Sequence, residues 1–245
     1  MRIVAMTYVC VECGTPSSSL YTEYSKGNII LTQCGKCLKF ADKYLEFDGV
    51  LLFIDMVLLK PQVYRHLIYN VLETGDYLKL RPILPRLAFL FILFDVYLKW
   101  FKFERNFGQG QLPHRDWPLL YQYLYILSMS AFSFFSLLAG ILFGAFLFKG
   151  WRFVKQRYDI ICLSIVISSF GKLLPLLMVI WDYEGVEYVW VAQVFVLVSN
   201  MEALLVYLEA GRVIPLLIMM WGCMCQGFTQ YAFWRWDPEL PFIML

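Results

Sequence analysis

The chain has 245 residues, of which 60% are hydrophobic and 18% aromatic, whereas only 16% are charged and the net charge is +2. Because soluble domains draw about a quarter of their residues from the charged types, this composition excludes an ordinary soluble fold and indicates a surface in contact with lipid. The small net charge also argues against a protein that binds nucleic acid.

The N-terminal residues 1–7 are too short and too weakly apolar for a secretory signal peptide. We therefore expect internal segments to direct membrane insertion and the N-terminal region to begin in the cytosol. Thiols stay reduced there, so metal binding is favoured over disulfides.

Four of the seven cysteines form two Cys-x-x-Cys pairs, Cys10 with Cys13 and Cys34 with Cys37. Two thiolates at this spacing can hold one edge of a tetrahedron from a tight turn. The two pairs are separated by 20 residues, which is typical of a zinc site with four thiolate ligands and no open position. A redox-active pair or an iron site in the same cage is the alternative.

Residues 1–48 are predicted to form a zinc ribbon around this site. Residues 18–24 and 29–33 read as the two strands of a hairpin. Gly14 and Gly35 are expected to provide the backbone freedom that the cysteine turns need. A module of this size has too small a core to fold alone, so the metal should supply much of its folding free energy.

Residues 49–82 are predicted to form one or two helices lying in the cytosolic membrane interface. Residues 50–59 are apolar except for Asp55, but they are too short to cross a bilayer. From Pro61 onward, apolar residues recur on one helical face. The alternative is a helix packed against the zinc module.

Residues 83–245 are predicted to form an all-α transmembrane bundle of about five helices, each near the roughly 20 apolar residues that a span requires. Tryptophans gather near the proposed ends, where their amphipathic rings favour the interface. The candidate spans are residues 83–101, 119–148, 160–181, 189–208 and 213–233.

The loop charges give a partial topology. With a cytosolic N-terminus, the basic loop at 149–158 is cytosolic and the acidic loop at 182–187 is lumenal, as the positive-inside rule requires. The basic residues between 99 and 115 would be lumenal, against that rule. Either the rule is overridden there or residues 83–101 do not cross.

Five charged residues lie within the candidate spans, and Asp95, Lys172 and Glu202 are the candidates among them for a lipid or partner site. Charges in a membrane are costly and mark functional sites. Lys172 is a candidate partner for Glu202, and Asp95 for Arg86 or Lys172. Such pairs either hold the bundle together or line a polar track for a lipid headgroup.

Residues 8–72 carry a long motif that closely resembles the homology domain of the Arv family. The matching segments are Cys10-Val-Glu-Cys13-Gly, Ser18-Ser-Leu-Tyr21, Tyr24-Ser-x-Gly27-x-Ile29, Leu31-Thr-x-Cys34-x-x-Cys37, Ala41-Asp-Lys-Tyr44, Glu46-x-Asp48 and Lys60-Pro-Gln-x-Tyr64-Arg-His66-Leu.

This resemblance implies a protein of the endoplasmic reticulum membrane, with the Golgi as a further location, that acts in sterol distribution and sphingolipid balance. It also implies a link to early glycosylphosphatidylinositol (GPI) anchor synthesis. The partners would be sterol, sphingolipid or GPI-precursor lipids. Alternatively, the chain would be a non-catalytic accessory subunit of the GPI N-acetylglucosaminyltransferase.

Within the matching segment, Lys60, Tyr64, Arg65 and His66 are candidates for contact with a lipid headgroup or partner. The alternative for His66 is a hydrogen bond within the domain, and His114 is expected to be solvated. The sequence contains no Gly-rich phosphate loop, HExxH motif or nucleophile elbow. We therefore predict a protein that is not an enzyme.

Overall fold

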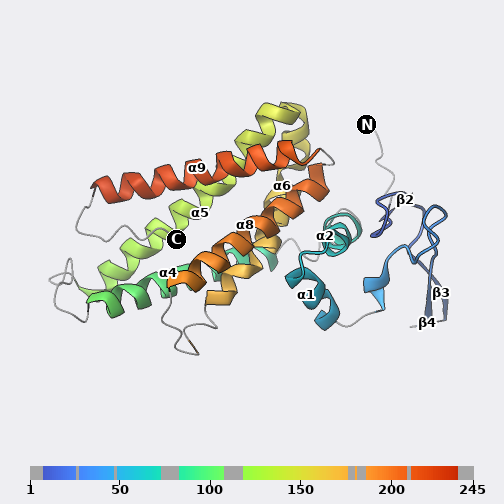
Figure 1. Cartoon of the computed structure of the whole chain (residues 1–245), viewed down its shortest axis with the longest axis horizontal. Coiled ribbons are helices and arrows are strands. Elements are labelled where there is room, and N and C mark those ends of the chain that lie inside the picture. The colour runs from blue at the N-terminus through green and yellow to red at the C-terminus, as the bar shows by residue number, and fades with distance from the viewer. Residues whose placement is uncertain are drawn as a thin grey trace. The chain divides into compact units, whose positions relative to one another are not determined.

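The structure, a computed structural model, describes residues 8–25, 28–46, 49–72, 83–107, 118–175, 180, 186–208 and 211–236 (Figure 1). The chain divides into two compact units. We call the unit of residues 1–83 and 202–209 the cysteine unit, and the unit of residues 84–201 and 210–245 the helical unit.

The cysteine unit begins with two separate two-stranded antiparallel sheets. The predicted hairpin corresponds to the second of them, whereas the first was not predicted, since two-residue strands are too short to show an alternating pattern. The sheets pair β1 (Tyr8–Val9) with β2 (Pro16–Ser17), and β3 (Tyr21–Ser25) with β4 (Asn28–Leu31).

Short helices follow the strands. Leu59 takes a left-handed conformation (φ 54°) that ends the first long helix, and Pro61 begins the next one. The elements are the 3₁₀ turn η1 (Lys43–Leu45), α1 (Gly49–Val57), α2 (Pro61–Arg65) and the π-helical segment η2 (His66–Leu72).

The α2–η2 segment packs on the first cysteine turn. Val63 forms a buried cluster with Val11 and Tyr44. The polar side of the segment is buried as well, including His66 and Asn70. This segment therefore matches the alternative of a helix packed against the cysteine module, rather than an exposed interfacial helix.

Helix α1 is apolar on two sides. Its inner side places Leu52 and Met56 against the cluster of Val11, Tyr44 and Val63. Its outer side exposes large apolar residues at the i, i+3, i+4, i+7, i+8 spacing of a single helical stripe. The exposed residues are Val50, Phe53, Ile54, Val57 and Leu58.

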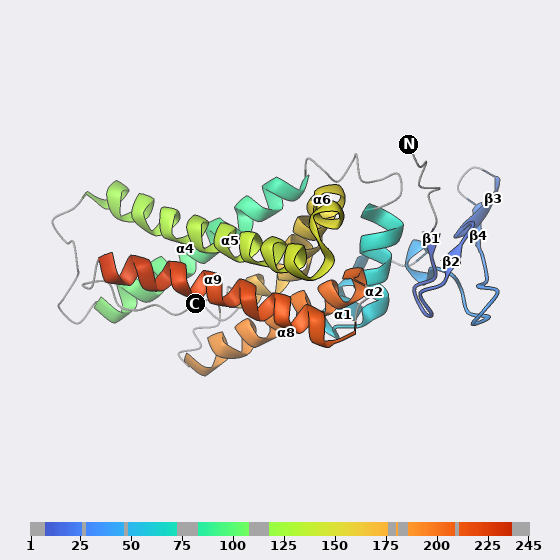
Figure 2. The same ribbon diagram turned by 90° about the horizontal axis from the view of Figure 1, so that it is seen from above.

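The helical unit is built from long helices (Figure 2). Its elements are α4 (Ile83–Phe107), α5 (Leu119–Lys149), α6 (Trp151–Ser168), the 3₁₀ turn η3 (Ser169–Leu173), α8 (Val186–Leu208) and α9 (Val213–Trp236). The last residues of α8 belong to the cysteine unit.

Within the described parts of the chain, three helices are long and apolar enough to cross a membrane: α5, residues 190–208 of α8, and α9. Helix α4 extends to Phe107 and gains charged residues beyond the predicted span. The segment 160–181 is interrupted, because α6 ends at Ser168 and η3 follows.

The predicted loop at 149–158 is wrong. Lys149 ends α5, Gly150 turns the chain with φ 86°, and α6 begins at Trp151. Of the basic residues assigned to that loop, Lys149 therefore lies on α5, and Arg152, Lys155 and Arg157 lie on the first turns of α6. Residues 182–185 of the predicted lumenal loop lie outside the described residues, as does His114, whereas residues 186–187 begin α8.

Helices α5 and α9 run alongside each other (Figure 1, Figure 2). A Cβ added at Gly140 of α5 would lie 2.9 Å from Gly222 Cα of α9, and one at Gly144 would lie 3.3 Å from Ile218 Cα. Gly140 and Gly144 form a GxxxG spacing, which lets helix backbones approach closely in a membrane.

Candidate functional site

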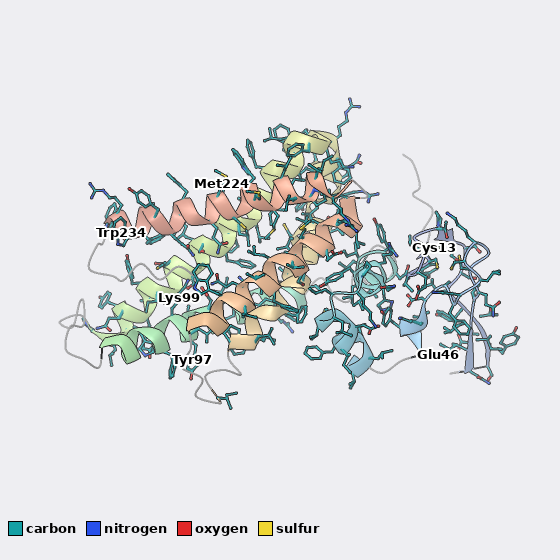
Figure 3. The ribbon with its side chains drawn as sticks, viewed as in Figure 1. Cys13, Glu46, Tyr97, Lys99, Met224 and Trp234 are labelled. Atoms are coloured by element: carbon teal, nitrogen blue, oxygen red, sulfur yellow. The ribbon has the colours of Figure 1, made fainter. Side chains whose placement is uncertain are left out.

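The four predicted cysteine ligands converge on one point in the cysteine unit; Figure 3 shows Cys13 among the strands. Their Sγ atoms all lie within 4.8 Å of one another, with Cys10 and Cys37 at 3.8 Å and Cys13 and Cys34 at 3.6 Å. A tetrahedral zinc site with bonds of about 2.3 Å has sulfur–sulfur edges of about 3.8 Å. These separations therefore fit a metal held by four thiolates and exceed the roughly 2.05 Å of a disulfide.

The two cysteine turns share the same backbone pattern. In each, the N–H four residues after the first cysteine donates to that cysteine's carbonyl: Gly14 N to Cys10 O at 2.9 Å and Leu38 N to Cys34 O at 3.0 Å. Both donating residues have a left-handed backbone conformation, with φ 73° at Gly14 and 59° at Leu38. The predicted role of Gly14 is thus confirmed, but that of Gly35 is wrong, because Leu38 takes the left-handed position in the second turn.

Thr15 was missed by sequence reasoning. Its hydroxyl oxygen lies 2.6 Å from Cys13 Sγ and 3.5 Å from Cys34 Sγ. This hydroxyl is the main reason that the pKa of Cys34 falls to about 5 and that the pKa of Cys13 is also lowered. Burial raises the pKa of Cys10 to about 12. A hydroxyl that favours thiolates at the cluster suits a metal site, since thiolates are the metal-binding form.

A buried polar network links the strands to η2. Asp42 is 0% exposed, and its Oδ2 lies 2.6 Å from His66 Nδ1 and accepts from Asn70 Nδ2 at 2.7 Å. The Asn70 amide also pairs with both backbone groups of Val9, at 2.9 and 3.0 Å. His66 is thus hydrogen-bonded within the unit, as its alternative interpretation expects.

A second polar group ties α1 to its neighbours. Asp55 accepts from Lys60 Nζ at 2.6 Å and from the Tyr44 hydroxyl at 2.9 Å, and Lys43 lies 3.5 Å away. Burial alone would raise the pKa of Asp55, but the hydrogen bonds from Lys60 and Tyr44 and the charge of Lys43 outweigh it and lower that pKa. Lys60 is therefore engaged in an internal ion pair.

Arg65 fastens α2 to the first cysteine turn. One of its terminal nitrogens donates to Val11 O at 2.8 Å and to Glu12 O at 2.9 Å. Tyr64 beside it is buried. The residues proposed as headgroup contacts therefore make internal contacts or lie buried, and they hold the helices on the cysteine turns.

Comparison with known protein families gives a match that includes both units. Residues 9–204 match the Arv1-like family. The chain belongs to this family. The stretch matched extends well beyond the cysteine module and includes most of the helical unit, so the family relationship covers both units.

Relatives of the Arv1-like family occur across eukaryotes. The chain is 33% identical to Protein arv1 of Schizosaccharomyces pombe, over 91% of this chain and 84% of that protein. It is 30% identical to Protein arv1 homolog of Dictyostelium discoideum, over 95% of this chain and 97% of that protein. It is 28% identical to Protein ARV1 of Homo sapiens, over 94% of this chain and 84% of that protein. No solved structure matches the chain.

The helical unit of this Arv1-family chain contains its own charged group. Asp95 Oδ2 lies 2.6 Å from Lys99 Nζ, which also donates to Ser130 Oγ at 3.0 Å. Asp95 was expected to pair with Arg86 or Lys172. Its direct ion pair is with Lys99, one turn away on the same helix, whereas Lys172 interacts with Asp95 through charge alone. Lys99 was missed because it lay near the end of the predicted span.

Lys172 and Glu202 belong to different units. Lys172 Nζ lies 5.1 Å above the ring of Phe134 on α5. Among the residues that the structure describes, no ion pair includes Glu202. The expected Lys172–Glu202 pair would join the two units and stays a prediction.

Proposed function

We propose that this Arv1-family chain is a multi-pass protein of the endoplasmic reticulum membrane that binds sterol or a related lipid and helps to distribute it between membranes. The proposed role is non-catalytic. Family membership and three membrane-length helices support a membrane protein with a general role in lipid homeostasis. Sterol as the cargo and transport as the activity are the finer parts of the proposal.

The observation that carries the proposal is a row of polar side chains between the apolar helices α5 and α9. Thr229 Oγ1 donates to Ser136 Oγ at 2.7 Å, and Gln226 Nε2 donates to Ser133 Oγ at 3.1 Å. A hydroxyl of a lipid can replace either partner in such hydrogen bonds at low cost, because it both donates and accepts. Apolar helices with hydroxyl and amide groups between them therefore suit a largely apolar ligand with one polar end.

The remaining features are proposed as follows. The four cysteines bind structural zinc in a ribbon-like head that faces the cytosol, and the exposed stripe of α1 lies in the membrane interface. Helix α4 and the α6–η3 segment also lie in the membrane, which would bring the number of spans to five. The contacts of Lys99 and Lys172 with the apolar helix α5 support this placement.

The test is sterol exchange between liposomes. Purified full-length protein, shown to be folded and loaded with metal, is reconstituted into donor vesicles that contain a fluorescent sterol, and transfer to acceptor vesicles is followed. We expect faster transfer than from protein-free vesicles. Equal rates in the two samples would contradict the proposal.

The accessory-subunit role is the other outcome of this test. Recovery of GPI N-acetylglucosaminyltransferase subunits with the chain in mild detergent, together with no acceleration of sterol exchange, would favour it. In that case the exposed helix faces would be protein-binding surfaces.

A further inference from the structure

The break between α6 and η3 is lined with polar side chains. The chain turns there from an α-helix to a 3₁₀ turn, at Ser168 and Ser169. Ser199 on α8 donates to the Ser168 carbonyl at 2.7 Å, and both serines hydrogen-bond the Asn200 amide. Broken helices inside membrane bundles are tolerated where they are buried in protein or line a binding site.

A lysine with no ion-pair partner among the described residues follows this break. Lys172 makes no ion pair or hydrogen bond with any residue described by the structure; its ammonium group lies over the Phe134 ring. The nearby carboxylate, Asp95, is bonded to Lys99 at 2.6 Å. Asp95, Lys99 and Lys172 influence one another electrostatically, so the group holds one positive charge in excess.

The excess charge lies deep in the apolar unit. Lys99 and Lys172 reach α5 at Ser130 and Phe134, which are one turn apart. Phe134 is the middle residue of α5 (Leu119–Lys149), the most apolar of the candidate spans. An uncompensated cation near the bilayer centre is costly, and such residues mark ligand or ion sites.

Asn200 provides a second unsatisfied group. Its side chain is 0% exposed, and its Nδ2 has no hydrogen-bond partner. Flipping the amide would exchange Oδ1 and Nδ2, and Oδ1 would then be the atom without a partner. One end of the Asn200 amide therefore lacks a hydrogen bond in either orientation. Residues i and i+3 eclipse in a 3₁₀ turn, so Lys172 lies on the same side of η3 as Ser169, which contacts Asn200.

We propose that Lys172, together with Lys99 and the free end of the Asn200 amide, binds the phosphate group of an anionic phospholipid. A phosphodiester carries one negative charge, which would balance the excess positive charge of Asp95, Lys99 and Lys172. The ammonium group of a lysine is a suitable point charge for binding a phosphate. A zwitterionic lipid such as phosphatidylcholine brings its own cation and leaves the excess charge unbalanced. The Asn200 amide would pair with a phosphate oxygen or a headgroup hydroxyl.

The inference rests on the membrane placement in the proposed function, but not on sterol transport. Native mass spectrometry of the full-length, metal-loaded protein would compare phosphatidylglycerol with phosphatidylcholine of the same acyl chains, and with inorganic phosphate as competitor. We expect phosphatidylglycerol to bind at least about tenfold more tightly. Lys172→Met should abolish this preference, and Lys172→Arg should retain it. Lys155→Met, which removes the same charge from an exposed position on α6, is the matched control.

Three results would overturn the inference: an unchanged preference in Lys172→Met, an equal loss in Lys155→Met, or displacement of the lipid by inorganic phosphate at similar concentration. If Lys172→Met does not fold, Lys172→Gln makes the same comparison. Sterol exchange is measured on the same samples. Exchange without phosphatidylglycerol preference contradicts this inference alone, whereas the preference without exchange contradicts sterol transport alone.

Discussion

At the scale of single residues, backbone conformation at the two cysteine turns limits which side chains are tolerated. Gly14 and Leu38 hold equivalent left-handed positions, one with no Cβ and the other with a leucine that is 75% exposed. A left-handed conformation costs a non-glycine residue about 1–2 kcal/mol. Leu38 therefore carries strain that no burial of its side chain offsets.

Substitutions at these turns test the backbone assignment. We expect Gly14→Ala to lower the free energy of unfolding by about 1 kcal/mol, because its φ is 73° although the nearest atom to an added Cβ is 3.9 Å away. Leu38→Gly should raise it by roughly 0.5 kcal/mol. Gly35→Ala, where no atom lies within 4 Å, is the neutral control. Chemical denaturation of the full chain in detergent measures all three, and a cost at Gly35 equal to that at Gly14 would contradict the assignment.

Tyr44 should make the cysteine unit sensitive to alkali. Burial, followed by the hydrogen bond to Asp55, raises its pKa above the ordinary value of 10.0. A raised folded-state pKa means that the stabilisation is complete below about pH 10 and is lost as the pH rises from there toward the folded-state pKa. At neutral pH, Tyr44→Phe should lower stability by about 1–2 kcal/mol through loss of the hydroxyl.

The measurement is the free energy of unfolding of wild type and Tyr44→Phe between about pH 8 and about pH 12. The difference between the two proteins should narrow above about pH 10, since only the wild type loses this contribution. A constant difference across the range would show that Tyr44 ionises alike in the folded and unfolded states.

At the scale of elements, the pairing of α5 with α9 depends on small residues. A Cβ at Gly140 would meet the backbone of Gly222, which cannot move as a flexible side chain can. The polar contacts of Ser133 and Ser136 with α9 lie on the same helix pair. Close backbone approach and hydrogen bonding thus act together, as expected where lipid removes the hydrophobic drive for helix association.

Gly140→Val should therefore separate the two helices. We expect a loss of about 1–3 kcal/mol from overpacking, seen as a lower midpoint of thermal unfolding in detergent. Gly227→Ala on α9 has no atom within 4 Å of the added Cβ and should be neutral or slightly stabilising. Equal midpoints for Gly140→Val and wild type would rule out this contact.

The α1 helix shows a different arrangement at this scale. Its inner face completes the core of the cysteine unit, and its outer apolar stripe is exposed. The stripe follows from the sequence between residues 50 and 58, which has almost no polar residue to place outward. A membrane surface is the covering that suits such a stripe.

At the scale of the whole molecule, the division into two units separates metal dependence from the membrane helices. The cysteine unit has a small core around Val11, Tyr44 and Val63, so its fold should depend on the metal. The helical unit has long helices whose backbone hydrogen bonds are made internally. The two units should therefore respond differently to a chelator.

Metal removal tests this separation. Elemental analysis should find about one zinc per chain, as expected for one four-thiolate site. A strong chelator should abolish the near-ultraviolet circular dichroism of the cysteine unit while leaving most of the helical signal. Cys34→Ser should lose the metal, and Cys162→Ser, in the helical unit, should retain it. Metal retention in Cys34→Ser would contradict the site.

Some features could be predicted from the sequence because they depend on local spacing. The four cysteines, the long apolar helices α5 and α9, and the family resemblance of residues 8–72 all follow from patterns within short stretches of chain. A long apolar segment indicates a helix, because a chain in lipid has to pair its backbone groups within the segment itself.

Tertiary structure alone decided which side chains meet. Arg65 bonds to Val11, His66 to Asp42, Lys99 to Ser130, and Gly140 faces Gly222 across many intervening residues. Residue types and spacing do not encode these contacts, because they depend on how separate elements pack. The errors at Gly35 and at the pairing of Asp95 have a local cause: Leu38 takes the left-handed position in the same turn as Gly35, and Lys99 lies one turn from Asp95 on the same helix. Composition identified residues suited to turns and ion pairs, but backbone conformation and helix packing determined which of them were used.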